Sequence, residues 1–358
     1  MCVSGRRILI MAGGTGGHVF PALAVAQKLM GAGAAVQWLG TRRGIEAELV
    51  PGAGIELNFL DIGGLRGKGA KVWLVMPWVL TKAVWQAMRV IKVFKPDAVL
   101  GLGGFASGPG GLAARLLGRP LLIHEQNAVA GTTNRWLAKL AGRRLEAFPN
   151  SLPNAEQVGN PVRMEISQLP EPPLRFEHGG KRRLLVLGGS LGALKLNQLL
   201  PEALAGISAD LRPQVWHQAG RNHLDVTETA YKSRQVDARV EAFIDNMAEA
   251  YGWADLVVCR AGALTVSEIT AAGVAALLVP FPFAIDDHQT KNAAWLVDNG
   301  AAIIKQESEL NAKVLQQELQ DLLSSSERLL AMAVNARGLA LPRAAERVAE
   351  ICLEVANA

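Results

Sequence analysis

A short apolar strand that passes through a glycine turn into a helix recurs along this chain, and its clearest copy begins at Asp255. Leu256–Cys259 is an apolar run rich in β-branched residues, which predicts a buried strand of a parallel sheet. Gly262 interrupts the chain, and Ala263–Ala272 then has helical composition. Because the first N–H groups of a helix have no partner within it, this helix can bind an anion at its start. The N–H groups concerned are those of Ala263, Leu264 and Thr265.

The residues around this helix suit a nucleotide sugar. Glu268 places a carboxylate inside the helix, and Ala275–Val279 predicts a further strand. Pro280–Phe283 then stiffens the chain, and Asp286–Gln289 presents four polar side chains in a row, which we expect to form a loop. A diphosphate at the helix start, a carboxylate one turn in and polar groups opposite would together satisfy such a ligand.

Three further strand–glycine–helix units predict a doubly wound α/β fold. The expected strands are Ile8–Met11, Asp97–Leu102 and Arg183–Leu187, and the glycine loops are Gly13–Gly17, Gly103–Gly108 and Gly188–Ala193. The first loop is not a dinucleotide fingerprint, because Val19 stands where the third glycine is required. Each loop is a candidate phosphate site, with a tight turn that binds nothing as the alternative. In the third loop, Ser190 is placed to donate to a phosphate or to cap the following helix.

Polar side chains at two places in the first half of the chain are candidates for chemistry. His18 follows the first glycine loop, where an imidazole can act as a general base; the alternative is a histidine that only satisfies a helix start. His124–Asn127 follows the expected strand Pro120–Ile123. Since open α/β sheets bind ligands at the carboxyl ends of their strands, we expect these side chains to line the ligand crevice.

The length of 358 residues predicts two domains. The boundary is expected at Val158–Arg163, which precedes a proline-rich stretch. We therefore expect a first domain over residues 1–162 and a second over residues 163–341. The last helix, about residues 342–358, is expected to pack back on the first domain.

Basic charge is concentrated in the first half of the chain. Residues 1–160 contain 18 Lys and Arg against 8 Asp and Glu, whereas residues 161–358 contain 19 against 24. The segment Lys71–Pro96 combines apolar residues at helical spacing with three tryptophans and no acid. Tryptophans and cations together favour an anionic membrane surface over nucleic acid, with a core helix as the alternative. The residues expected at the membrane are Trp73, Trp78, Lys82, Trp85 and Arg89.

The cysteines and the start of the chain predict a cytoplasmic location. The three cysteines lack C-x-x-C spacing, which favours a reducing compartment and no zinc site. The N-terminal residues have no signal-peptide pattern, and no apolar run approaches the roughly 18 residues of a membrane span. Asp286–Asp287 is the one adjacent acidic pair, and we expect a hydrogen-bonding loop there rather than a magnesium site.

Eight segments, taken in order, resemble the MurG family. They are GGTGGHVFPALA, GLGGFASGP, HEQNAVAGTTNRWLA, GNPVR, GGSLGAL, FIDNM, RAGALTVSE and DDHQTKNA, and they extend over nearly the whole chain. The family transfers N-acetylglucosamine from UDP-GlcNAc to undecaprenyl-diphospho-muramoylpentapeptide (lipid I), forming lipid II for the peptidoglycan on which cell shape and division depend. The resemblance implies the GT-B fold, two Rossmann-like doubly wound domains facing a cleft. It also implies an inverting glycosyltransferase without metal or cofactor, peripheral to the cytoplasmic face of the inner membrane.

The resemblance also implies roles for individual residues. His18 is implied as the catalytic base, the backbone of Ile244 as the uracil contact and Glu268 as the partner of the ribose hydroxyls. The residues implied to bind UDP-GlcNAc are Thr15, Gly16, Gly17, Asn127, Arg163, Ser190, Ile244, Ala263, Leu264, Thr265, Val266, Ser267, Glu268, His288 and Gln289. The residues implied near the acceptor diphosphate are Gly13, Gly14, Gly103, Gly104 and Ser107.

The chain departs from the family pattern at two positions, and two other functions compete with it. Leu191 stands where the family usually has glutamine, and Phe105 where tyrosine is common. A different GT-B enzyme with a lipid acceptor, such as a diacylglycerol glucosyltransferase, is disfavoured by the segment HEQNAVAGTTNRWLA. A non-catalytic sugar-nucleotide-binding or membrane-docking subunit is disfavoured because donor half, acceptor half and His18 occur in one chain.

Overall fold

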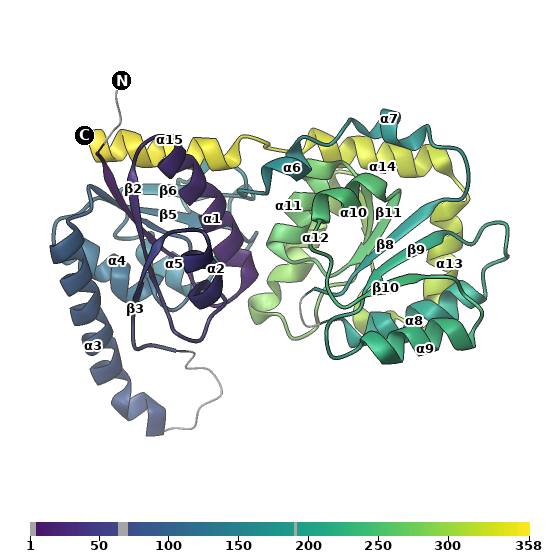
Figure 1. Ribbon diagram of the computed structural model, residues 1–358, viewed down its shortest axis with the longest axis horizontal. Helices are drawn as coiled ribbons and strands as arrows, with labels where there is room; N and C mark the ends of the chain where they lie inside the picture. Colours follow the sequence, from purple (N-terminus) through teal and green to yellow (C-terminus); the bar gives the residue numbers. More distant parts are fainter. Residues whose placement is uncertain (1–4, 64–70, 190–191) are drawn as a thin grey trace. The chain divides into compact units, whose positions relative to one another are not determined.

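The computed structural model describes residues 5–63, 71–189 and 192–358, without the side chains of residues 71–75 and of Ile285. The chain forms two compact units. Unit 1 is Met1–Val162 together with Leu341–Ala358, and unit 2 is Arg163–Ala340. Each unit is a parallel sheet with helices packed against it (Figure 1).

The described part of unit 1 contains a seven-stranded parallel sheet of order β3-β2-β1-β4-β5-β6-β7. Its strands are β1 (Arg7–Met11), β2 (Ala35–Gly40), β3 (Glu56–Phe59), β4 (Ala98–Gly101), β5 (Leu121–Glu125), β6 (Arg143–Glu146) and β7 (Glu156–Gln157). Its helices are α1 (Gly16–Gly31), α2 (Glu46–Gly52), α3 (Lys71–Phe94), α4 (Ser107–Leu116), α5 (Thr132–Leu137) and α15 (Ala344–Asn357). Every residue of β4 and β5 is buried, so both faces of the sheet are covered.

The two faces of this sheet carry separate apolar cores. Successive residues of a strand point to opposite faces. Ile8 and Ile10 accordingly pack in the cluster that holds the buried residues of α1 and α15. Leu9 and Met11 pack in the cluster that holds buried residues of α3, α4 and α5. The strand β1, which lies between β2 and β4, therefore contributes side chains to both cores.

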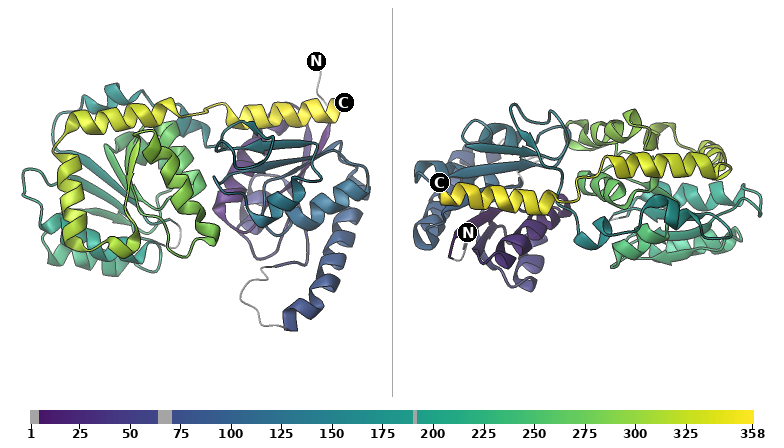
Figure 2. Two further views of the ribbon diagram at one scale, coloured as in Figure 1. Left: turned by 180° about the vertical axis from the view of Figure 1, so that it is seen from behind. Right: turned by 90° about the horizontal axis from the view of Figure 1, so that it is seen from above.

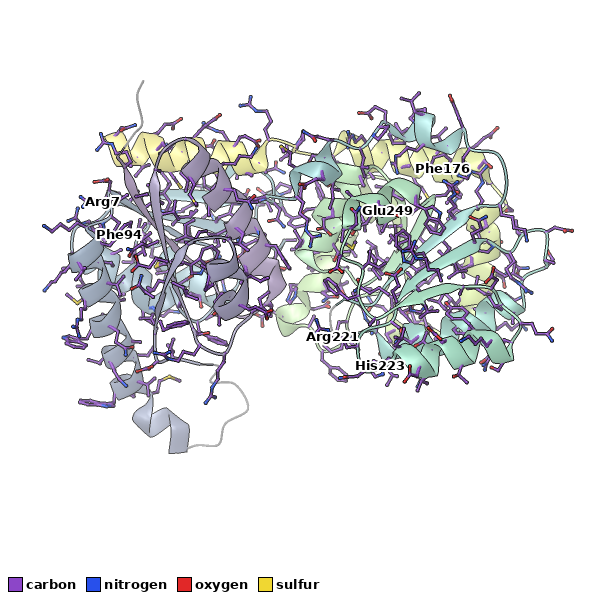
Figure 3. The ribbon with its side chains drawn as sticks, viewed as in Figure 1. Arg7, Phe94, Phe176, Arg221, His223 and Glu249 are labelled. Carbon is purple, nitrogen blue, oxygen red and sulfur yellow. The ribbon has the colours of Figure 1, made fainter. Side chains whose placement is uncertain are left out.

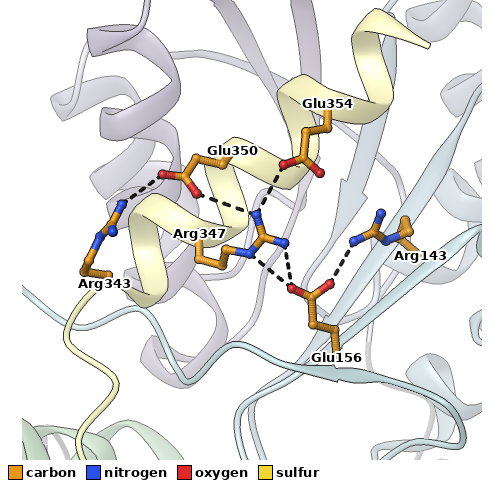
Figure 4. A network of polar contacts seen from close by, with 6 residues as sticks. All are labelled: Arg143, Glu156, Arg343, Arg347, Glu350 and Glu354. Atoms are coloured by element: carbon orange, nitrogen blue, oxygen red, sulfur yellow. Dashed lines mark hydrogen bonds and ion pairs between the residues drawn. The ribbon is translucent and has the colours of Figure 1, made fainter.

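The last helix of the chain, α15, belongs to unit 1, where it packs against α1 (Figures 1 and 2). A polar network also holds it to the edge strand β7 (Figure 4). Both Nε and Nη2 of Arg347 donate to Oε1 of Glu156, at 3.1 and 2.8 Å, and Arg143 donates to the other oxygen at 2.8 Å. These bonds outweigh the opposing effect of partial burial and lower the pKa of Glu156.

The described part of unit 2 contains a six-stranded parallel sheet of order β10-β9-β8-β11-β12-β13. The strands are β8 (Arg183–Leu187), β9 (Gln214–Gln218), β10 (Arg239–Glu241), β11 (Leu256–Cys259), β12 (Ala275–Leu278) and β13 (Ala302–Ile304). The helices are α6 (Met164–Ser167), α7 (Pro172–Phe176), α8 (Leu194–Ala205), α9 (Leu224–Ser233), α10 (Met247–Trp253), α11 (Ala263–Ala272), α12 (His288–Asp298), α13 (Ala312–Leu323) and α14 (Ser326–Gly338), with 3₁₀ turns at Ile285–Asp287 and Glu307–Glu309. Apolar side chains fill the space between sheet and helices in each unit (Figure 3).

Two expected loops are shorter than predicted, because an α-helix begins inside each of them. The helix α1 begins at Gly16, so Gly17 and His18 lie in its first turn rather than in a loop. The helix α12 begins at His288, after Asp286 and Asp287 have turned the chain with φ of 54° and 50°. Glycine and polar composition disfavoured helix at both places, but tertiary packing overrides such propensities. In the part of the chain that is described, no helix has both the length and the apolar character needed to cross a bilayer.

Candidate active site

The first two glycine loops of unit 1 are in contact with each other. They follow the neighbouring strands β1 and β4, whose last residues Met11 and Gly101 are paired. Gly104 has φ +81°, and a Cβ there would lie 2.3 Å from the carbonyl oxygen of Gly13. Only glycine permits this approach and this backbone conformation. The two loops, both expected at the acceptor diphosphate, therefore form one surface at the carboxyl edge of the sheet.

The buried hydroxyl of Ser107 is bonded to the backbone at the end of β1 and just after β4, at Met11 and Gly103. Its side chain is fully buried, and its hydroxyl is 2.9 Å from the carbonyl oxygen of Met11 and 2.6 Å from that of Gly103. The same hydroxyl oxygen accepts from the N–H of Gly103 at 3.1 Å. The hydroxyl of Ser107 therefore holds Gly103, and its expected place near the acceptor diphosphate stays a prediction.

Glu46, which the sequence did not single out, supports the first loop. Its side chain is fully buried, and Oε2 accepts from the N–H of Gly14 at 3.0 Å. Its Oε1 accepts from the N–H and the hydroxyl of Thr41, at 3.0 and 2.7 Å. A Cβ on Gly13 would lie 2.5 Å from that same oxygen. The N–H of Gly14 is thus already bonded to a carboxylate, and its expected place near the acceptor diphosphate stays a prediction.

His18 lies beside these loops and is held by Gln126. Nδ1 of His18 is 2.8 Å from Oε1 of Gln126. A Cβ on Gly103 would lie 3.0 Å from Cε1 of His18, so the ring packs directly on the second loop. Thr15 is the N-cap residue of α1 without a side-chain cap bond, and Gly16 and Gly17 supply the first N–H groups of the helix. An imidazole and a helix start therefore occur together at this edge.

Two of the polar side chains expected to follow the strand, those of His124 and Glu125, lie inside it. The strand continues through Glu125, so both His124 and Glu125 are buried. One oxygen of Glu125 accepts from the N–H of Asn127 at 2.9 Å, and the other accepts from Gly131 and from Asn134, at 3.1 and 2.9 Å. Glu125 therefore organises the loop that carries Asn127, and the half-buried Asn127 is the member of this segment that reaches the surface.

In unit 2, the helix α11 begins directly after β11 at the carboxyl edge of the sheet. Gly262 is its N-cap residue, without a side-chain cap bond, so the first N–H groups are open to a ligand. Those N–H groups belong to Ala263, Leu264 and Thr265. Val266 is fully buried and its N–H donates to the carbonyl of Gly262, and its expected role in donor binding stays a prediction. The hydroxyl of Ser267 donates to the carbonyl of Ala263 at 2.8 Å.

Glu268 lies inside this helix as a buried carboxyl. Its side chain is 5% exposed, and Oε2 accepts from the hydroxyl of Tyr251 at 3.2 Å. Burial raises the pKa of Glu268 to about 7, while the charge of Arg163 and the bond from Tyr251 oppose the rise. Tyr251 was not predicted, because its partner is seventeen residues away on another helix. A buried carboxyl with a raised pKa thus lies one turn from a helix start whose first N–H groups are open.

The backbone N–H of Ile244, where the uracil contact is expected, already has a hydrogen-bond partner. The N–H of Ile244 donates to Oε1 of Gln218 at 3.1 Å, and both residues are buried. Gln218 is the last residue of β9. A base that bonds to this N–H would have to displace the Gln218 side chain.

The segment after β12 is held by Arg260, another residue that the sequence did not single out. Nη1 of Arg260 donates to the carbonyls of Val279 and Pro280, both at 3.2 Å, and its Nη2 pairs with Glu307. Oε1 of Gln289 accepts from the N–H of Phe281 at 2.9 Å, which leaves the amide nitrogen of Gln289 for a ligand. His288 is half-buried in the first turn of α12. Ser190 and Leu191 lie outside the described residues.

The helix α3 exposes a stripe that includes four of the five residues expected at a membrane. Trp78 and Trp85 are 75% and 61% exposed, and Lys82 and Arg89 lie on the same face. The opposite face is buried through Ala83, Ala87 and Ile91. An acid from outside the helix, Asp61, pairs with Lys82 at 2.9 Å and so reduces the positive charge of the stripe. The side chain of Trp73 lies outside the described residues.

Metal ligands do not gather at either edge. Across residues 5–63, 71–189 and 192–358, no group of three or more His, Cys, Asp or Glu side chains could hold an ion. Asp287, in the acidic pair, accepts from the hydroxyl of Thr290 at 2.6 Å.

Comparison with known protein families assigns both units. Residues 8–145 match the glycosyltransferase family 28 N-terminal domain, and residues 183–348 match the family 28 C-terminal domain. The chain belongs to glycosyltransferase family 28. Within this family, it is 57% identical to a protein of Nitrosococcus oceani over 98% of this chain and 99% of the relative, and 54% identical to one of Pseudomonas putida over the full length of both. Both relatives are named UDP-N-acetylglucosamine--N-acetylmuramyl-(pentapeptide) pyrophosphoryl-undecaprenol N-acetylglucosamine transferase.

Solved structures agree with this assignment. The crystal structure of Acinetobacter baumannii MurG superposes with a TM-score of 0.87 at 44% identity and covers 98% of this chain and 99% of that one. A glycosyltransferase of kitacinnamycin superposes with a TM-score of 0.71 at 18% identity, over 96% and 98% of the two chains, which shows a shared fold alone. The predicted membership of the MurG family and the predicted pair of parallel-sheet α/β domains are both confirmed.

Proposed function

We propose that this family 28 enzyme transfers N-acetylglucosamine from UDP-GlcNAc to undecaprenyl-diphospho-muramoylpentapeptide, forming lipid II for peptidoglycan. The observation that carries the proposal is 57% identity, over nearly the whole length of both chains, to a relative named for this transfer. Both domains of the family are present in the chain, one in each unit. A binding protein would require only one of them.

We assign donor binding to unit 2. The start of α11 takes the diphosphate, with Ser190 as a further donor, because open N–H groups and the helix dipole both favour an anion. Glu268 accepts from the ribose hydroxyls, the backbone of Ile244 contacts the uracil, and Arg163 lies near the nucleotide. The side-chain amide of Gln289 and the imidazole of His288 orient the sugar. From unit 1, Thr15, Gly16, Gly17 and Asn127 contact the transferred sugar.

We assign the role of general base to His18. Neutral imidazole takes the proton of the acceptor hydroxyl while the hydroxyl oxygen attacks the anomeric carbon from the face opposite UDP. The new carbon–oxygen bond forms as the bond to the β-phosphate oxygen breaks, and UDP leaves with the electron pair. The configuration at the anomeric carbon is inverted, and His18 ends the step as an imidazolium.

The leaving UDP gains negative charge, and we propose that backbone donors stabilise it without a metal. The N–H groups of Ala263, Leu264 and Thr265 are fixed by the helix before the reaction begins. Such preorganised donors act like an oxyanion hole, in which losing one donor costs about 3–4 kcal/mol of barrier. The acceptor diphosphate is assigned to Gly103 and Gly104 with the neighbouring Gly13.

We propose that the exposed stripe of α3 places unit 1 on an anionic membrane at its cytoplasmic face, where a lipid-linked acceptor is found. Trp78 and Trp85 supply indole rings at the level of the headgroups, and Arg89 adds positive charge. Nucleic acid is not expected as a partner, because the stripe combines its cations with exposed apolar surface.

The transfer is tested with radiolabelled UDP-GlcNAc and a short-chain analogue of the lipid-linked acceptor. We expect label in the lipid-linked product with an inverted anomeric configuration. A diacylglycerol acceptor in place of the analogue should give no product, and preferential labelling of that lipid would refute the proposal.

The role of His18 is tested separately with His18→Ala. We expect kcat to fall by roughly 10²–10⁴, the scale of a positioned proton acceptor, because the variant has no group to take the proton. The Kd of UDP-GlcNAc, measured by calorimetry, should be little changed. A variant with near-normal kcat would reduce His18 to a residue that only completes the start of α1.

A further inference from the structure

The hydrogen bonds around His18 continue through two more buried side chains. Gln126 is bonded to His18 at one end, and its Nε2 is 3.0 Å from Nδ1 of His124 and 3.1 Å from the carbonyl oxygen of His124. The other ring nitrogen of His124, Nε2, is 2.9 Å from the carbonyl oxygen of Gly159. His124 is fully buried and Gln126 is 1% exposed, so bulk water does not compete for these bonds.

Two backbone carbonyls determine the direction of every bond in this path. A carbonyl oxygen only accepts, so the atom of Gln126 that faces the carbonyl of His124 must be the amide nitrogen. The amide oxygen of Gln126 then faces His18, and Nδ1 of His18 must carry the proton. For the same reason, Nε2 of His124 donates to Gly159 and Nδ1 of His124 accepts from Gln126. The reverse orientation of the Gln126 amide would put two acceptors against each other at 3.1 Å.

We propose that Gln126 is a positioning residue that holds His18 as the Nδ1–H tautomer, so that the lone pair of Nε2 is free to take the acceptor proton, and that His124 and Gly159 fix Gln126 in turn. The inference rests on the proposed role of His18 as the base. Histidine side chains that are free in water favour the opposite tautomer, with the proton on Nε2. In that tautomer Nε2 has no lone pair with which to accept a proton. The path from Gly159 to His18 selects the reactive form before the substrates bind.

The path ends in neutral groups, and this has a chemical consequence. A carboxylate beside Nδ1 would stabilise the imidazolium more strongly than the amide oxygen of Gln126 does. An amide oxygen orients the ring with a smaller effect of this kind, and its bond to Nδ1–H strengthens once Nε2 has taken a proton. Burial lowers the pKa of His124, although the bond to Gly159 and the charges of Glu125 and Glu146 act to raise it. His124 therefore stays neutral, and its Nδ1 remains an acceptor.

The test combines a tautomer measurement with kinetics on the full-length protein. In protein labelled with ¹⁵N-histidine, the His18 signal, assigned by its loss in His18→Ala, should show a protonated Nδ1 and an unprotonated Nε2. Gln126→Met keeps the size of the side chain without the acceptor, and we expect it to move the His18 proton to Nε2. We expect kcat to fall by roughly 10- to 100-fold, by analogy with the loss of an outer hydrogen-bond partner from a metal-ligating histidine. The KM for UDP-GlcNAc should be unchanged.

Two further variants separate positioning from folding. Gln157→Met makes the same replacement at an exposed glutamine of β7 and should leave the tautomer and kcat unchanged. His124→Phe removes the ring nitrogens but keeps the backbone carbonyl that accepts from Gln126, so its loss of kcat should be smaller than that of Gln126→Met. Circular dichroism and the Kd of UDP-GlcNAc report whether each variant is folded.

The outcomes distinguish this inference from the proposed function. A wild-type His18 with its proton on Nε2, or a Gln126→Met variant that keeps both the tautomer and kcat, overturns the positioning role. A Gln126→Met variant that changes the tautomer without changing kcat supports the positioning role of Gln126. The same result overturns the role of His18 as the base.

Discussion

The buried carboxyl of Glu268 makes donor binding dependent on pH. Its pKa is raised from 4.5 to about 7 by burial, so ionisation in the free enzyme costs about 3 kcal/mol more than in water. Ribose hydroxyls would donate to the ionised form and stabilise it, which lowers the pKa in the complex. UDP-GlcNAc binding therefore favours release of a proton from Glu268.

The magnitude follows from this linkage. Below about pH 7 each unit of pH weakens binding by up to tenfold until the pKa of the complex is reached. We expect the Kd of UDP-GlcNAc to be up to about ten times higher at pH 6 than at pH 8. UDP-GlcNAc is the correct probe because its phosphates are diesters that do not titrate near neutrality, whereas the terminal phosphate of UDP does.

The assay is isothermal titration calorimetry in buffers of different ionisation enthalpy, which gives both the Kd and the number of protons released. Glu268→Gln should bind with no pH dependence, and at pH 8 more weakly than wild type by about 1 kcal/mol, because a charge-assisted bond becomes neutral. Glu249→Gln replaces an exposed glutamate of α10 and should keep the wild-type profile (Figure 3).

Stability gives a second readout with the opposite sign. Because the folded pKa of Glu268 is raised, its contribution to stability is present below about pH 4.5 and is lost as pH rises through about 7. The free energy of unfolding of the free enzyme should therefore increase in Glu268→Gln relative to wild type at pH 8, by up to about 3 kcal/mol. Equal Kd values for wild type at pH 6 and pH 8, or a pH dependence that survives in Glu268→Gln, would refute the reasoning.

Three further predictions concern the metal, the membrane and the last helix. Transfer should continue unchanged in EDTA, since backbone donors at α11 stabilise the leaving group; activity lost in EDTA and restored by magnesium would contradict this. Replacing Trp78 and Trp85 by serine should reduce cosedimentation with anionic vesicles and leave turnover of a soluble acceptor unchanged. The control Leu174→Ser, at an exposed leucine of unit 2, should change neither property. A tryptophan variant that unfolds would favour the core-helix alternative. Arg347→Ala should lower the free energy of unfolding by about 1 kcal/mol, because it breaks the network on β7, with a smaller effect at high salt. Arg343→Ala, which removes one exposed pair, should lower the free energy of unfolding by less. Equal losses in the two variants would contradict the assigned role of the network.

Those parts of the fold that depend on local apolar patterns could be predicted from the sequence. The strand Leu256–Cys259 and the helix Ala263–Ala272 have the predicted bounds, because a buried run is bordered by an acid before it and a glycine after it. The α/β class followed from repeated glycine turns, since each occurs where a strand gives way to a helix. The family followed from the resemblance of eight segments taken in order.

The supporting residues could not be predicted, because each acts through a partner that is distant in sequence. Glu46 reaches back thirty-two residues to Gly14, and Gln126 reaches 108 residues to His18. No spacing rule relates such positions. The polar segment after Ile123 was misplaced for a related reason, since the strand β5 continues for two residues more than its apolar run and buries His124.

The return of α15 to unit 1 has a consequence for the order in which the molecule is made. Synthesis from the amino end delivers residues 1–162 first, but the apolar face that holds Ile8 and Ile10 is completed only by Val348 and Ile351. Unit 2 is a continuous stretch of chain that lies between these two parts in the sequence. Unit 2 can therefore form its core before α15 has been synthesised and has packed on unit 1. The part of the chain that is translated first is then the last to complete its core.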